Sequence, residues 1–78
     1  MIKVGQIYKE NETNLSFVIT REYTNPQGKK KYDWIYNSGM VGDYQSEHQV
    51  LSHTTLITEY PTWQEAVNSK EFKTENEE

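Results

Sequence analysis

One short segment of the sequence carries side chains that could bind a metal ion or transfer protons. It combines carboxylates and imidazoles at Asp43, Glu47, His48 and His53. Imidazole nitrogens and carboxylate oxygens are common ligands of zinc and manganese. The two histidines are five positions apart, however, whereas a helix directs two side chains at one ion when they are four apart. We therefore interpret both histidines as surface residues and expect no metal or other cofactor.

The remaining sequence argues against an enzyme. The chain has no cysteine, which excludes thiol nucleophiles, thiolate zinc sites and disulfides. No serine lies in a nucleophile-elbow motif, and the four isolated glycines do not form a phosphate-binding loop. A chain of 78 residues also has little volume for a pocket that encloses a substrate.

Charge is unevenly distributed along the chain, whose net charge is −4. Residues 21–36 carry four cations against two carboxylates, whereas residues 43–71 carry five carboxylates against one lysine. Tyrosines accompany the basic segment, and tyrosine is enriched at binding surfaces. We therefore predict a basic and aromatic binding surface made of Arg21, Tyr23, Lys29, Lys30, Lys31, Tyr32 and Tyr44.

Three functions are compatible with this surface and charge pattern. The first is a non-enzymatic interaction module that binds a protein partner, because the tyrosines and tryptophans exceed what one helix and one sheet face can bury. The second is a nucleic-acid-binding barrel, in which the lysines follow a phosphate backbone while a ring stacks on a base. The third is an acidic decoy or inhibitor of a host protein, presenting Glu47, Glu59 and Glu65 to a basic surface.

The strongest local structure signal is a β-hairpin. Apolar residues alternate with polar ones over 15–23 and again over 32–36, which is the period of a half-buried strand. Between them, Asn25-Pro26-Gln27-Gly28 combines residues that favour a tight turn. If Thr24 faces Lys29, one face pairs Phe17 with Tyr36, Ile19 with Trp34, and Arg21 with Tyr32. The other, more polar face then pairs Val18 with Ile35, Thr20 with Asp33, and Glu22 with Lys31.

Three further strands are expected at 4–9, 40–45 and 54–60, with one possible helical turn at 46–52. A C-terminal helix should begin after Thr62, because Thr62-Trp63-Gln64-Glu65 has the pattern of a capping box. Trp63, Ala66 and Val67 then share one helical face, which we expect to lie on the sheet.

These elements predict a mainly β domain over residues 1–72, specifically a small SH3-like five-stranded antiparallel barrel with a C-terminal helix. The alternative is an α+β sheet with one helix across it. The polar, acidic residues 73–78 are expected to be a disordered tail. No signal peptide or membrane span is evident, so we expect a cytoplasmic protein of undetermined oligomeric state. The predicted core contains Val4, Ile7, Phe17, Ile19, Trp34, Tyr36, Leu51, Leu56, Trp63 and Val67.

The segment 60–72, which reads YPTWQEAVNSKEF, resembles the end of small uncharacterised proteins encoded by phages and prophages of low-GC Gram-positive bacteria. The resemblance covers about a sixth of the chain. It implies a phage or prophage origin and no particular activity.

Overall fold

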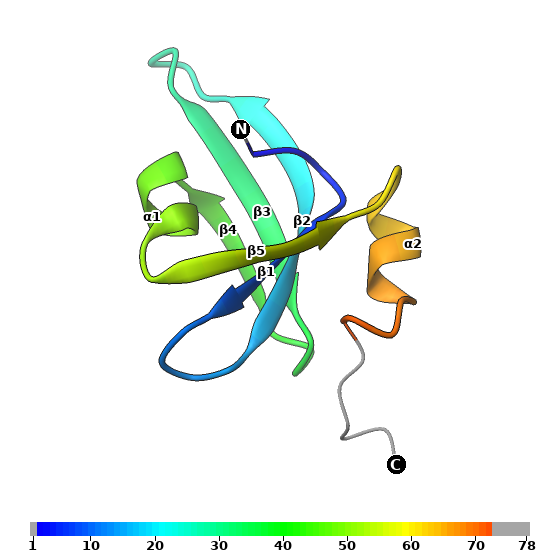
Figure 1. Ribbon diagram of the computed structural model, residues 1–78. Helices are drawn as coiled ribbons and strands as arrows, with labels where there is room; N and C mark the ends of the chain where they lie inside the picture. Colours follow the sequence, from blue (N-terminus) through cyan, green and yellow to red (C-terminus); the bar gives the residue numbers. More distant parts are fainter. Residues whose placement is uncertain (1, 73–78) are drawn as a thin grey trace.

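The protein forms one five-stranded antiparallel sheet with two short helices (Figure 1). The structure, a computed structural model, describes residues 2–72, so the predicted tail at 73–78 lies outside the described residues. The elements in chain order are β1 (Gln6–Glu10), β2 (Ser16–Thr24), β3 (Lys30–Tyr36), β4 (Val41–Gln45), α1 (Glu47–Leu51), β5 (Thr54–Glu59) and α2 (Trp63–Val67). The strand order is β4-β3-β2-β1-β5, and the sheet is not closed. The prediction of a mainly β fold with five antiparallel strands is therefore confirmed.

The hairpin of β2 and β3 follows the predicted register only in the half that is farther from its turn. Phe17 faces Tyr36, Val18 faces Ile35 and Ile19 faces Trp34, as expected. A bulge then lies between Ile19 and Arg21, so that Arg21 pairs with Asp33 instead of Tyr32. The predicted facing of Thr24 with Lys29 is wrong by one residue, because Thr24 pairs with Lys30. One extra residue on a strand changes the pairing of every later residue on that strand.

The turn of this hairpin is built as its sequence predicts. The Asn25 side-chain oxygen accepts hydrogen bonds from the backbone amides of Gln27 and Lys29, at 3.1 and 2.9 Å. Gly28 adopts a φ of 83°, in the left-handed region that favours glycine. The chain therefore reverses through the side-chain hydrogen bonds of Asn25 and the left-handed backbone of Gly28.

Each face of the sheet carries its own apolar cluster. The face beneath α1, here called the α1 face, buries a set of rings and aliphatic side chains: Ile2, Tyr8, Phe17, Ile19, Tyr32, Trp34 and Val50. The face beneath α2, here called the α2 face, buries Ile7, Val18, Ala66 and Phe72, with Ile35 and Trp63 packed against them. The expectation that Trp63 joins Phe17 and Trp34 in a single interior is therefore wrong. Both faces are covered because the two helices lie on opposite sides of the sheet (Figure 1).

Most of the predicted core is confirmed, with two exceptions. Leu51 and Leu56 are about half exposed, whereas Val50 is fully buried. The short helix α1 turns Val50 toward the sheet, and on a helix the next residue points roughly 100° away, which places Leu51 outside. Leu56 lies on β5, at the edge of the sheet. Val4, Tyr36, Trp63 and Val67 are partly buried.

The two helices begin at side-chain caps. The Ser46 hydroxyl accepts a hydrogen bond from the Gln49 amide, and the Ser46 amide donates one to the side-chain oxygen of Gln49, so the complete capping box belongs to α1. At α2, the Thr62 hydroxyl accepts from the Glu65 amide at 3.2 Å, which is the N-cap half of the predicted motif. The cap directs Ala66 onto the sheet, where it is fully buried.

Tyr36 carries a hydrogen bond that links two strands. Its hydroxyl donates to a carboxylate oxygen of Glu10 at 2.6 Å. Burial, followed by this hydrogen bond, raises the pKa of Tyr36 to about 12 from its ordinary value of 10.0. A neutral phenol is therefore favoured in the folded state, and its contribution to stability is present below pH 10 and is lost as the pH rises toward 12.

Tyr36→Phe keeps the ring and removes this hydrogen bond. We expect it to lower the free energy of unfolding by about 1–2 kcal/mol at neutral pH, since one partner is a partly buried carboxylate. Urea denaturation at neutral pH measures this loss. When the denaturation is repeated at several pH values between 10 and 12, the free energy of unfolding should fall less steeply with pH in the variant than in wild type. The control is Tyr44→Phe at an exposed ring, which should change neither quantity; an equal loss there would contradict the assignment.

Candidate functional site

A cluster of charged and aromatic side chains lies on the α2 face, near Trp63 at the start of α2. Tyr32 and Trp34 point to the α1 face, so Asp33, which lies between them on β3, points to the α2 face. The bulge in β2 brings Arg21 opposite Asp33. Their side chains form an ion pair at 3.6 Å. The Arg21 guanidinium lies 4.1 Å from the centre of the Tyr23 ring. The bulge therefore creates this arrangement, because without it Arg21 would pair with Tyr32.

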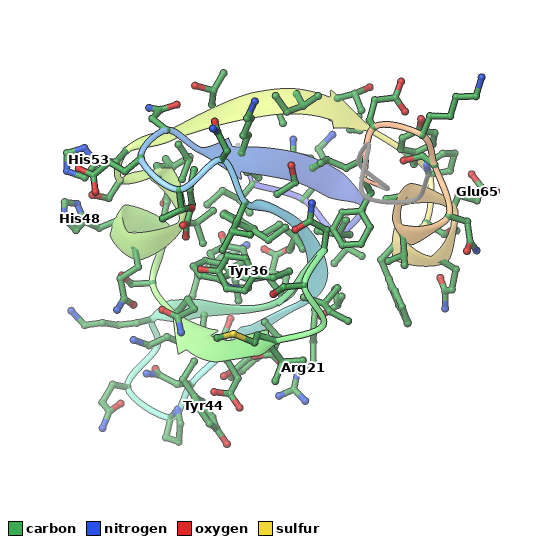
Figure 2. The ribbon with its side chains drawn as sticks, turned by 90° about the horizontal axis from the view of Figure 1, so that it is seen from below. Arg21, Tyr36, Tyr44, His48, His53 and Glu65 are labelled. Atoms are coloured by element: carbon green, nitrogen blue, oxygen red, sulfur yellow. The ribbon has the colours of Figure 1, made fainter. Side chains whose placement is uncertain are left out.

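Tyr44 completes the cluster from the neighbouring strand. Its ring meets Tyr23 edge to face at 6.2 Å, and its backbone amide donates to Asp33 at 3.2 Å. The Tyr44 backbone has a φ of 60°, and the hydrogen bond from its amide to Asp33 ties this backbone to β3. Tyr44 is 70% exposed. Figure 2 shows Arg21 and Tyr44 on the same side of the molecule, away from Tyr36 in the interior.

An open groove of about 460 Å³ adjoins this cluster. Its apolar part consists of the cross-strand pair Ile35 and Val41, with Trp63 of α2 as one wall. Its polar part includes the charged residues Arg21, Asp33 and Asp43. We call this site the groove. Met40, next to Val41, is also exposed, so apolar surface continues beyond the groove along the start of β4.

The groove is formed by residues of β2, β3, β4 and α2, and packing outside the groove holds α2 and β4 in place. Trp63 is the first residue of α2, which is fixed by the Thr62 cap and by Ala66 on the sheet. Gly42 pairs with Trp34, and a Cβ at Gly42 would overlap the indole nitrogen. The absence of a side chain at Gly42 therefore allows β4 to lie close against β3 over the Trp34 ring. As a result, Val41 and Asp43 are presented on an ordered strand.

The groove is mildly acidic. The Asp33 carboxylate is paired with Arg21, and Asp43 is exposed with no ion-pair partner among residues 2–72. One unpaired carboxylate beside an apolar floor favours a ligand that carries a positive charge next to an apolar group.

The structure separates the residues predicted to form one basic surface. Arg21, Tyr23 and Tyr44 do come together. Tyr32 does not join them, because only 3% of it is exposed and its ring belongs to the cluster on the α1 face. Lys30 pairs with Glu22 at 2.6 Å, and both border a separate pocket with Tyr32.

The other two lysines lie near the hairpin end. Lys31 pairs with Tyr23 across the strands and is partly exposed, and Lys29 is exposed beside the turn. Two of the four cations in 21–36 are therefore neutralised by ion pairs. The local positive charge seen in the sequence is correspondingly weaker in the folded chain.

The histidines and carboxylates considered as metal ligands do not form a cluster. His48 and His53 lie at the α1 end of the molecule, whereas Asp43 borders the groove (Figure 2). Within residues 2–72, no group of three or more His, Asp or Glu side chains could hold a metal ion. His53 is the residue directly before β5, and its backbone adopts a left-handed conformation with a φ of 57°.

Sequence reasoning missed the apolar half of the groove. It assigned Trp63 to the interior and did not identify Ile35 or Val41 as residues that line a groove. The only available signal was the run Gly39-Met40-Val41-Gly42, where two apolar residues lie between glycines. That pattern does not distinguish a buried strand from an exposed edge strand.

Within residues 2–72, no helix is long and apolar enough to cross a membrane. No family model matches this chain, and neither does any curated protein or solved structure with which it was compared.

Proposed function

We propose that this protein is a non-enzymatic interaction module that binds a segment of a protein partner in the groove. The observation that carries the proposal is the exposed apolar surface of Val41 beside Trp63 and Ile35, next to an unpaired Asp43. Val41 is 69% exposed. The proposal includes the SH3-like class, the phage or prophage origin and the cytoplasmic location expected from the sequence. Three bulges, in the β1–β5, β2–β3 and β3–β4 pairs, support strong bending of the kind that small barrels need.

The groove defines the chemistry of the bound segment. A volume of about 460 Å³ accepts one or two side chains rather than a folded surface. An aliphatic or aromatic side chain would lie between Trp63 and Val41, and a lysine or arginine beside it would reach Asp43. The cluster of Arg21, Tyr23 and Tyr44 would contact the same segment further along β4.

The folded charge distribution favours this function over the two alternatives. Nucleic-acid binding needs several free cations on one surface, but Arg21 and Lys30 are in ion pairs and Lys30 borders a different pocket. The decoy hypothesis needs Glu47, Glu59 and Glu65 on one surface. Glu47 belongs to α1 and Glu65 to α2, and these helices lie on opposite sides of the sheet (Figure 1).

The test uses a display library of random linear peptides selected on the immobilised protein. We expect wild type to enrich peptides in which an apolar residue stands next to lysine or arginine. Val41→Glu should weaken binding of the enriched peptides by about tenfold or more, because it places a charge on the apolar floor. Since Val41 is exposed, this substitution should leave the fold intact.

Two further variants define the site. Asp43→Asn should weaken binding several-fold and reduce its dependence on salt, because it removes the unpaired carboxylate. Leu56→Glu is the matched control, since Leu56 is a half-exposed apolar residue on the opposite edge strand. It should leave peptide binding unchanged.

Two results would overturn the proposal. One is that wild type enriches no peptide above the level of Val41→Glu. The other is that a fluorescent single-stranded oligonucleotide binds at low salt and is released when Lys29 and Lys31 become glutamine, which would favour the nucleic-acid function.

A further inference from the structure

We propose that the outer edge of β5 pairs with β5 of a second copy of this chain, joining two sheets into one. The proposal does not depend on the groove, which lies beside β4 at the other end of the strand order. In the described chain, β5 is hydrogen-bonded to β1 on one side and has no strand on its other side. An unpaired edge presents backbone donors and acceptors that another strand can satisfy.

The sequence of β5 lacks most of the features that usually protect an edge. Residues 54–58 contain three threonines, a leucine and an isoleucine, with no charge and no proline. Threonine and isoleucine are also favoured in strands. Natural proteins block exposed edges with lysine, proline, inward-facing charges or bulges. Of these features, residues 54–58 of β5 have only a bulge, at Ile57 in the pairing with β1, and no charge or proline blocks their outer edge.

The opposite edge, β4, is a poorer template. It contains Asp43, and the backbone of Tyr44 has a φ of 60°, outside the extended region. These features interrupt a regular ladder in the middle of a five-residue strand. Of the two free edges, β5 is thus the one suited to strand pairing.

Exposed apolar side chains gather near β5. Leu56 is 49% exposed, Ile57 is 44% exposed, and Leu51 on the adjacent helix α1 is 47% exposed. Leu56 pairs with Tyr8 and so points to the α1 face, where Leu51 also lies. Pairing of two copies would bring these leucines of both chains together and remove them from water.

A symmetric antiparallel pair centred on Leu56 brings no like charges together. In this register Leu56 faces the partner's Leu56, and Thr54 faces the partner's Thr58. Glu59 comes opposite the position before the partner's β5, and not opposite a second carboxylate. Self-complementarity of this kind is what a two-fold interface requires.

Sedimentation of the full chain over micromolar to millimolar concentrations provides the first test. We expect the mass to rise from 9.2 kDa toward twice that value. Leu56→Lys should keep the chain monomeric at concentrations where wild type is dimeric, because two lysines would face each other at the centre. Val41→Lys, on the β4 edge, is the matched control and should dimerise like wild type.

A cysteine cross-link provides a second test that does not depend on a destabilising charge. Because the chain has no cysteine, Leu56→Cys introduces a single thiol. Directly opposed residues in an antiparallel pair have Cα atoms about 4.5–5.5 Å apart, within disulfide range. Under mild oxidation we expect efficient cross-linking of Leu56→Cys and little of Thr58→Cys, whose two copies would be roughly 13 Å apart along the strands.

The two tests give separate grounds for rejection. A wild-type chain that stays monomeric throughout, or a dimer that survives Leu56→Lys, would overturn the β5 interface. Equal cross-linking of Leu56→Cys and Thr58→Cys would overturn the register. None of these results bears on peptide binding in the groove.

Discussion

Phe17→Ala is expected to lower the free energy of unfolding by about 3–5 kcal/mol, the usual loss when a fully buried phenylalanine is truncated. Phe17 has no exposed surface and stacks on Trp34 with ring centres 4.2 Å apart. It also contacts the rings of Tyr8 and Tyr36. Removing it leaves a cavity that three rings line. A domain of this size has roughly 3–5 kcal/mol of net stability, so the variant should be largely unfolded at 25 °C.

Urea denaturation of wild type, followed by tryptophan fluorescence, sets the reference for this measurement. The control is Leu56→Ala, an apolar truncation at a half-exposed position, which should cost less than about 1 kcal/mol. A loss below about 1 kcal/mol for Phe17→Ala would contradict a core built around this ring.

Gly5→Ala is expected to destabilise the fold by about 3 kcal/mol, through backbone strain and overlap together. Gly5 lies between two strands that are distant in sequence: its amide donates to Ile19 at 2.9 Å, and its carbonyl accepts from Tyr60 at 3.0 Å. Its φ is 97°, and a Cβ would overlap the Tyr60 carbonyl oxygen. Since that oxygen belongs to the backbone, it cannot move aside as a side chain could.

Gly28→Ala separates these two causes. Gly28 has a similar φ of 83°, but a Cβ there meets nothing within 4 Å. The Gly28 variant should therefore show the strain alone, about 1–2 kcal/mol. Denaturation midpoints of both variants measure the difference. Equal losses would show that the close approach of Gly5 to Tyr60 does not constrain the fold.

Much of the fold could be predicted because its signals are local. Alternation of apolar residues identified β2 and β3, and the chemistry of Asn25 and Gly28 identified the turn between them. The Thr62 cap located the start of α2 correctly. Each of these features depends on residues within a few positions of one another, and backbone sterics or hydrogen bonding determines their outcome directly.

The candidate site could be predicted only in part. Arg21, Tyr23 and Tyr44 do lie together, as their aromatic and basic character suggested. Tyr32 is buried, because strict alternation places it on the same face as Trp34. Ile35 and Val41 were missed because whether an apolar strand residue is covered depends on how far α2 extends over the sheet.

The sequence by itself therefore determined the five strands, the hairpin turn and the helix start, since these follow from short-range periodicity and capping. Only the tertiary structure decided that the apolar residues divide between two faces and that a bulge after Ile19 turns Arg21 toward Asp33. The physical reason is that a strand residue changes face with a one-residue shift of register, and the register is fixed by the combined packing of both faces. The groove beside Trp63 is a product of that packing.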